Sequence, residues 1–182
     1  MSAKRSSRSA GVASVNALPR TALGKVMPVD EDKESNISLV IRNSQRVRNL
    51  SMRAVRGLLE AFLRAQGITA ELGVVFVSSR KMADANWRFL QHEGSTDVIT
   101  FDHGSTRKHL KGDILISISD AVNQAEEFRT DWEEETSRYL IHALLHLQGF
   151  DDKEPLARRR MKLEENRWLR RMQRGGWVRL ER

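Results

Sequence analysis

Two histidines four residues apart, His142 and His146, lie inside an apolar stretch that has the periodicity of a helix. Residues at i and i+4 share one helix face, with Cβ atoms roughly 5–6 Å apart, so both imidazoles can reach one metal ion. Gly149 follows, and glycine is the residue that most often ends a helix in a left-handed turn. Such a turn can bring Asp151 or Asp152 back toward the histidines as a third ligand. Three protein ligands and one open position are typical of a catalytic rather than a structural zinc site.

The same stretch has a structural alternative, in which each buried histidine is held by an ordinary hydrogen bond. Burying two imidazoles on one helix face without partners costs free energy, and a shared metal ion removes that cost. The sequence has no cysteine, so any metal must be held by His, Asp or Glu. These ligand types fit zinc, manganese, iron or nickel without choosing among them.

The residue after the first histidine argues against one class of metal enzyme. A zinc peptidase of the H-E-x-x-H type carries its general base, a glutamate, directly after the first histidine. This sequence has Ala143 at that position. Peptide hydrolysis by that mechanism therefore has no obvious base here.

Positive charge is concentrated near the C-terminus of the 182-residue chain, whose formal net charge is +7. Residues 153–182 contain eleven Lys and Arg against four Asp and Glu, whereas residues 35–152 contain fourteen against sixteen. A clustered basic segment is expected of a protein that meets nucleic acid or the ribosome, although a solvated helix face has the same composition. No apolar run approaches the length of a membrane span, so we expect no membrane partner.

Residues 1–35 differ in composition from the rest of the chain. They are rich in Ser, Ala, Arg and Lys and show no sustained period, which predicts a disordered basic and serine-rich extension. The first 28 residues contain no acidic residue, as in an organelle transit peptide, but they lack the hydrophobic core of a secretory signal. We expect a cytoplasmic protein, with an organelle as the alternative location, and a single folded domain over residues 36–182.

Strands and helices alternate along that domain. Short apolar and β-branched runs predict strands over residues 37–41, 72–77, 97–101 and 112–117. Apolar residues at helical spacing, with capping and stop signals, predict helices over 52–66, 79–90, 119–128, 132–147 and 154–173. We expect an α+β fold with a mixed sheet of about four strands packed against about five helices. The metal site should lie at the end of the central helix over 132–147.

Three blocks of sequence, followed by a helical tail, occur in a recognisable order. The first block along the chain is Asn86-Trp-Arg-Phe89-Leu90-Gln-His92 with Ser95-Thr96-Asp97-Val98-Ile99-Thr100-Phe101, and the second is Gly112-Asp113-Ile114-Leu115-Ile116. The third is the histidine segment, His142-x-x-x-His146-x-x-Gly149-x-Asp151-Asp152. The helical tail covers Met161 to Glu165. In type and order they resemble the YbeY family of metal-dependent endoribonucleases. The resemblance extends from about residue 37 to residue 173.

The resemblance implies a single-strand endoribonuclease that acts in 16S rRNA 3'-end maturation and ribosome quality control. It implies one divalent metal ion per chain, which we expect to be zinc, held by His142, His146 and Asp152. The implied partners are rRNA and the small ribosomal subunit, with a small-subunit ribosomal protein and the GTPase Era. Basic side chains of the last helix would guide RNA toward the metal, namely Arg158, Arg159, Arg160, Arg167, Arg170 and Arg171.

Two positions depart from the family's commonest pattern. In the family's commonest pattern a third histidine follows ten residues after the first, and this sequence has Asp152 at that position. An aspartate can bind zinc through a carboxylate oxygen, and this sequence resembles a branch of the family that has aspartate as the third ligand. Many members carry an arginine, taken to bind the RNA phosphate, where this sequence has Leu90. We hypothesise that His92 faces the metal and acts as a phosphate donor or general acid; the alternative is a surface loop residue. Asp97 and Asp113 match the pattern, and we expect them to have scaffold roles.

Two other functions fit part of this pattern. The main alternative is a non-catalytic ribosome assembly factor with a structural metal, because the family's arginine is missing. The other is a metal-dependent hydrolase of a different substrate, such as a peptide, and Ala143 counts against it.

Overall fold

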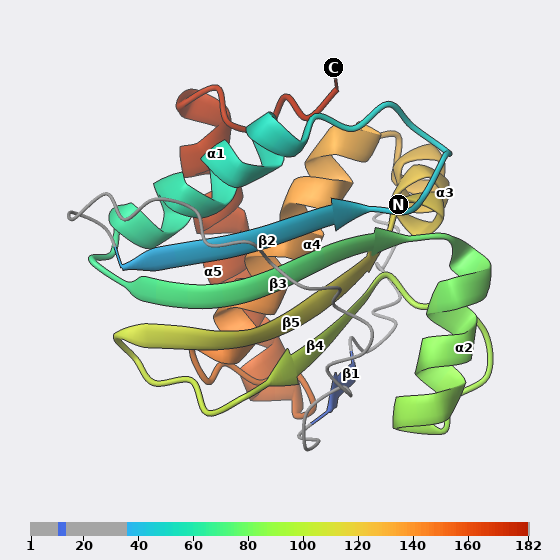
Figure 1. The fold of residues 1–182 in the computed structure, drawn as a ribbon, viewed down its shortest axis with the longest axis horizontal. Coiled ribbons are helices and arrows are strands. Elements are labelled where there is room, and N and C mark those ends of the chain that lie inside the picture. The colour runs from blue at the N-terminus through green and yellow to red at the C-terminus, as the bar shows by residue number, and fades with distance from the viewer. Residues whose placement is uncertain (1–10, 14–35, 182) are drawn as a thin grey trace.

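The computed structural model describes residues 11–13 and 36–181. Its strands form a five-stranded mixed sheet in the order β1-β4-β5-β3-β2 (Figure 1). The strands are β1 (Gly11–Ala13), β2 (Ile37–Asn43), β3 (Thr69–Val77), β4 (Val98–Asp102) and β5 (His109–Ser117). β2, β3 and β5 are mutually parallel, β4 is antiparallel to β5, and β1 is parallel to β4. The four expected strands are confirmed, and β1 is an addition.

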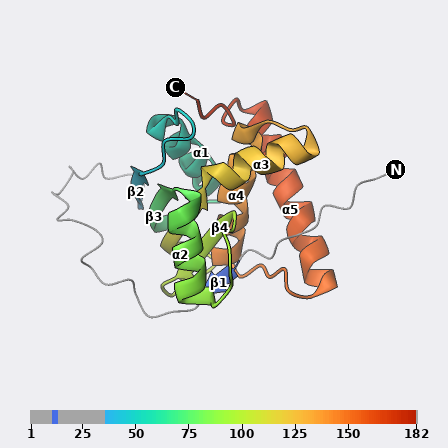
Figure 2. The same cartoon turned by 90° about the vertical axis from the view of Figure 1, so that its right-hand side faces the viewer.

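Five helices surround the sheet within residues 36–181, some packed on it directly and others on neighbouring helices, which confirms the expected α+β architecture. They are α1 (Met52–Arg64), α2 (Ser79–Leu90), α3 (Ile118–Phe128), α4 (Trp132–Leu147) and α5 (Pro155–Arg174). α1, α4 and α5 lie on one face of the sheet, with α4 passing behind β5 and β4 (Figure 1). Figure 2 shows α2 on the side of the sheet away from α5. None of the helices described is long and apolar enough to cross a membrane.

The two faces of the sheet bury different amounts of apolar surface. Alternating residues of a strand point to opposite faces, so in β5 the fully buried Ile114 and Ile116 join the main core with α1, α4 and α5. On the other face, α2 inserts Met82 into a smaller cluster with Ile99 and Phe101. α4 is therefore enclosed between the sheet and α5, and its side chains lie in a low-dielectric environment.

The bounds of the elements differ from the expectation mainly at polar strand ends. β3 and β5 begin at Thr69 and His109, earlier than predicted, because their polar first residues pair across the two strands. One such pair is an ion pair of 3.1 Å between Lys111 and Glu71. Of the expected extension over residues 1–35, Gly11–Ala13 forms β1 against β4. The rest of that extension lies outside the described residues, so its disorder stays a prediction.

Candidate metal centre

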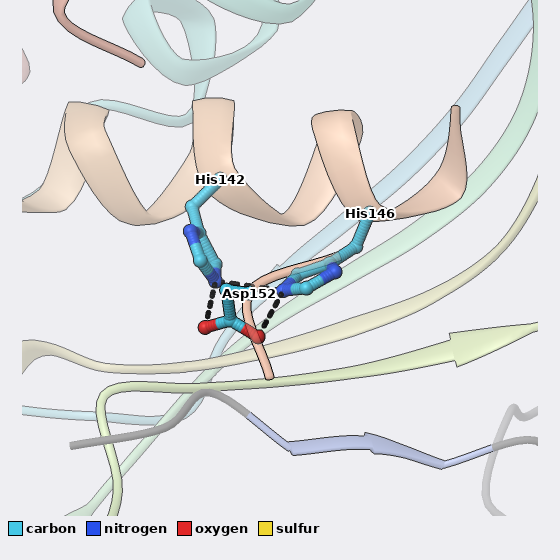
Figure 3. A group of neighbouring side chains, drawn as sticks. All are labelled: His142, His146 and Asp152. Carbon is cyan, nitrogen blue, oxygen red and sulfur yellow. Dashed lines mark hydrogen bonds and ion pairs between the residues drawn. The ribbon is translucent and has the colours of Figure 1, made fainter. Parts of the chain in front are cut away.

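α4 carries both histidines of the expected metal site on one buried face. Asp131 starts the helix by accepting a hydrogen bond from the backbone N–H of Glu133 at 2.9 Å, and the helix runs to Leu147. The side chains of His142 and His146 project from the same side, and are only 12% and 2% exposed (Figure 3). Their Nε2 atoms lie 2.8 Å apart. The i, i+4 spacing therefore produces the juxtaposition predicted from the sequence.

A left-handed turn after α4 returns the chain to the histidines. Gly149 has a φ of 90°, in the region that favours glycine. Asp152 follows, and its carboxylate faces the two imidazoles (Figure 3), with Oδ1 3.8 Å from Nε2 of His146 and Oδ2 4.0 Å from Nε2 of His142. The exposed Asp151 instead accepts the backbone N–H of Asp152 at 2.8 Å. The spacing alone left both aspartates open, the resemblance to the YbeY family selected Asp152, and the structure brings Asp152 to the site.

Hydrogen bonds on the far side of each ring direct both Nε2 lone pairs toward Asp152. Nδ1 of His146 lies 2.9 Å from the carbonyl oxygen of Phe150, which can only accept, so this nitrogen carries the proton. Nδ1 of His142 lies 2.5 Å from a carboxylate oxygen of Glu165. The ligand atoms of the two histidines and Asp152 lie within 4.8 Å of one another. Three electron-pair donors that converge in this way suit a divalent cation, and their chemistry fits zinc.

Burial and charge push the pKa values of the two histidines in opposite directions. Burial works to lower the pKa of His142, but the hydrogen bond and charge of Glu165, with the charges of Asp97 and Asp152, outweigh it, and the pKa is raised. Burial and the positive charge of His142 lower the pKa of His146 to about 4. His142 is therefore the more basic of the two histidines, and His146 the one whose Nε2 lone pair is more readily available.

Comparison with known proteins identifies the family to which this site belongs. A protein-family model described as Endoribonuclease YbeY matches residues 29–173. The chain belongs to the YbeY family. This membership confirms the resemblance seen in the sequence.

Individual members of the YbeY family resemble this chain over most of their length. The protein named Endoribonuclease YbeY from Parabacteroides distasonis is 39% identical over 66% of this chain and 84% of its own. That from Chlorobium luteolum is 34% identical over 75% of this chain and 98% of its own. The solution structure of a Thermotoga maritima protein has a TM-score of 0.56 at 22% identity, covering 72% of this chain and 86% of that one. This last likeness concerns the fold alone.

The position at which the resemblance to the YbeY family implies an arginine is apolar here. Leu90 ends α2 and packs, partly buried, against the small cluster on the outer face of the sheet. His92 lies exposed in the following loop, after Gln91 in a left-handed conformation with a φ of 57°. Within residues 36–181 the cluster of metal-ligating side chains does not include His92. Its role as a phosphate donor or general acid stays a prediction.

Asp97 and Asp113 have the scaffold contacts expected of them, and Asp97 adds an electrostatic one. Oδ1 of Asp97 accepts hydrogen bonds from the backbone of Val98 at 2.9 Å and from the hydroxyl of Thr96 at 3.0 Å. Burial raises the pKa of Asp97, and its charge in turn helps to raise the pKa of His142. Asp113 contacts His103, with 2.9 Å between Oδ2 and Nε2, and is not a member of the metal cluster.

The arginines of α5 divide into two groups. Arg158 reaches back to the loop that carries Asp152, where Nε donates to the carbonyl of Asp152 and Nη2 to that of Lys153, both at 2.9 Å. The remaining arginines are exposed on the side of α5 away from its buried residues. We call this surface the outer α5 face and define it by Leu156, Arg159, Arg160, Leu163, Arg167, Arg170, Arg171 and Arg174. Their i, i+3, i+4 and i+7 spacing places them along one stripe of the helix.

Glu165 contacts the metal site, although the sequence reasoning gave it no role. It is buried in α5 among Met161, Trp168, Leu169 and Met172, the apolar residues that pack α5 on the core. A charged residue on the buried stripe of an amphipathic helix is the signal that could have found it, because a charge in that position needs a partner. Its partners are His142 and Arg138.

Proposed function

We propose that this protein is a metal-dependent endoribonuclease that cleaves single-stranded segments of ribosomal RNA during 16S rRNA 3'-end maturation and ribosome quality control. The observation that carries the proposal is the convergence of His142, His146 and Asp152 with both Nε2 lone pairs directed inward. Membership of a family whose model is described as Endoribonuclease YbeY supports RNA as the substrate.

The three ligands would hold one divalent ion, which we propose to be zinc. When bound, such an ion makes water a nucleophile near neutral pH and offsets charge that develops on a phosphate. Asp152 contributes one negative charge to the site, and Asp97 contributes a second one nearby. His92, exposed in the loop before β4, can supply a proton to the phosphate or to the leaving oxygen.

The outer α5 face is the proposed path by which RNA reaches the centre. α5 begins at Pro155, immediately after the loop that carries Asp152, so the basic stripe starts next to the metal ligands. Five of the predicted RNA-binding arginines, Arg159, Arg160, Arg167, Arg170 and Arg171, lie exposed along it. Arginine binds phosphate through a charged, planar fork, and such contacts weaken as salt is added.

A basic stripe of this kind also supports a ribosomal setting. We propose that the protein acts in the cytoplasm on the small ribosomal subunit, near a small-subunit ribosomal protein and the GTPase Era. Sedimentation of the tagged chain with separated ribosomal subunits tests this setting. Association with the small subunit is the expected result, and equal recovery with both subunits or with neither argues against it.

A second candidate function is a ribosome assembly factor whose metal is structural. The packing of Leu90 favours it, because an apolar side chain in place of the family's arginine offers no charge to a phosphate. Metal-loaded protein incubated with single-stranded and duplex forms of an rRNA 3'-end fragment separates the two candidates. Cleavage of the single strand that is lost in His146→Ala and on chelation supports the enzyme. Binding of the RNA fragment by the metal-loaded protein, without cleavage of either form, supports the assembly factor.

A further inference from the structure

We propose that Glu165 is a positioning residue for the metal centre and that Arg138 holds it in place. In this arrangement the carboxylate of Glu165 keeps the proton of His142 on Nδ1, which leaves Nε2 free to bind the ion. The proposal deepens the function proposed above and rests on it, because it assumes that His142 is a metal ligand.

The contact between Glu165 and His142 joins two helices. Oε1 of Glu165, on α5, lies 2.5 Å from Nδ1 of His142, on α4, and the two side chains are only 10% and 12% exposed. A short hydrogen bond to a charged acceptor is stronger than a neutral one, and burial limits competition from water. The ring of His142 is therefore fixed in orientation as well as in the placement of its proton.

The second carboxylate oxygen of Glu165 is held by a cation. Oε2 lies 3.8 Å from Nη1 of Arg138, and the same nitrogen donates to Oδ1 of Asn166 at 2.7 Å. The other guanidinium nitrogens of Arg138 lie 3.6 Å from carboxylates of Glu134 and Glu135. Arg138 precedes His142 by one helical turn, so both side chains lie on the same side of α4. The carboxylate of Glu165, from α5, lies between the guanidinium of Arg138 and the imidazole of His142.

The second histidine depends on a different kind of partner. Nδ1 of His146 donates to the backbone carbonyl of Phe150, which is placed by the turn at Gly149. A backbone acceptor cannot be removed by a side-chain substitution, whereas the acceptor for His142 can. Without Glu165, a neutral His142 can carry its proton on Nε2 instead, where the proton blocks a metal ligand. Loss of Glu165 should therefore weaken the site through His142 alone.

Zinc affinity measured by competition with a chelating dye tests the proposal without reference to RNA cleavage. We expect Glu165→Ala to bind zinc about ten- to a hundredfold more weakly than the wild-type chain. Glu165→Gln keeps an acceptor oxygen but no charge, so its affinity should lie between the two. Glu164→Ala is the matched control, because Glu164 is the neighbouring carboxylate and pairs with Arg167 rather than with a ligand. Arg138→Met should lose less affinity than Glu165→Ala.

A nitrogen NMR spectrum of the zinc-loaded chain gives a second readout. The proton on Nδ1 of His142 should give a resolved signal in the wild type that shifts in Glu165→Gln, whereas the His146 signal should stay in place. Thermal unfolding with chelator present checks that each variant is folded, and Glu165→Gln carries the test if Glu165→Ala does not fold. Wild-type zinc affinity in folded Glu165 variants overturns the role of Glu165, and wild-type affinity in Arg138→Met overturns that of Arg138. A wild-type chain that binds no zinc overturns the proposed function itself.

Discussion

Arg158 donates a hydrogen bond from Nε to the main-chain carbonyl of Asp152 at 2.9 Å, which ties the first turn of α5 to the loop that carries the third proposed metal ligand. A second bond, from Nη2 to the carbonyl of Lys153, holds the same loop. These contacts separate Arg158 from the arginines of the outer α5 face, with which the sequence grouped it. The distinction leads to two different predictions.

Replacing Arg158 should affect the metal rather than the RNA. Arg158→Ala removes two hydrogen bonds to backbone carbonyls, each worth about 1 kcal/mol, and frees the loop around Asp152. We expect weaker zinc binding and a small loss of stability, with little change in RNA affinity once the site is saturated with metal. Zinc competition and RNA binding at saturating zinc measure the two effects. Unchanged zinc affinity together with a large loss of RNA affinity would return Arg158 to the RNA-binding group.

Replacing arginines of the outer α5 face should have the opposite result. Arg167→Ala and Arg170→Ala remove exposed charges that contact no metal ligand, so zinc affinity should be unchanged. RNA affinity should fall, and the slope of its logarithm against the logarithm of salt should become shallower by about 0.7 for each RNA phosphate that the variant no longer neutralises. Fluorescence anisotropy with a single-stranded RNA over a salt series gives this slope. An identical slope in the double variant contradicts the proposed RNA path.

The charge of Asp97 should lower the stability of the metal-free chain at neutral pH and raise its affinity for zinc. Burial raises its pKa above the ordinary value of 3.8, so the folded chain holds this proton more tightly than the unfolded chain does. The contribution of Asp97 to stability is therefore fully present below 3.8 and is lost as the pH rises through the folded pKa. Asp97→Asn removes the charge, so the metal-free variant should be more stable than the wild type at neutral pH, and the difference should shrink in acid.

The same substitution should weaken zinc binding, because it removes a negative charge that favours a cation at His142. Denaturant unfolding with chelator, near neutral pH and in mildly acidic buffer, measures the stability difference, and dye competition measures the affinity. Lower stability at neutral pH combined with unchanged zinc affinity would mean that Asp97 has a scaffold role only.

Glu133 should contribute to stability far from the metal centre. Its buried Oε1 accepts the backbone N–H groups of Leu180 and Glu181 at 3.2 and 2.8 Å, so it joins the first turn of α4 to the C-terminal segment. Glu133→Ala leaves these donors without that acceptor and should cost about 1–3 kcal/mol of unfolding free energy. Glu127→Ala on the exposed side of α3 is the control. Equal unfolding midpoints for the two variants would contradict this account.

Local signals in the sequence were sufficient to predict the helix that carries the site. The predicted helix over 132–147 has the same bounds as α4, because Asp131 caps its first turn and the left-handed turn at Gly149 follows its end. Gly149 likewise predicted the turn that returns Asp152, since a positive φ is a local property of glycine. The spacing could not choose between Asp151 and Asp152, because adjacent aspartates differ only in the direction each takes after the turn. The resemblance to the YbeY family selected Asp152, whose carboxylate lies beside the histidines in the structure.

Contacts between distant segments were harder to predict. Glu165 pairs with a residue 23 positions away, and its place on the buried stripe of α5 indicates that it needs a partner but not which one. β1 adds to the edge of β4 across a long separation in sequence, from a segment whose composition is not that of a strand. His103 pairs with Asp113, a contact that no local signal in the sequence indicated, because the end of β4 lies beside β5. In each case the missing information was which surfaces the fold brings together.

Stepwise return of zinc to metal-stripped protein, with single-strand RNA cleavage as the readout, tests the central claim most directly. The account predicts no cleavage by the stripped chain, a rise as zinc is added, and saturation at one equivalent per chain, because His142, His146 and Asp152 form one site. The Asp152→Ala variant should not reach the wild-type rate of RNA cleavage at any ratio of zinc to protein. Cleavage by the stripped chain, or a His146→Ala variant as active as the wild type, would contradict the assignment of catalysis to this centre.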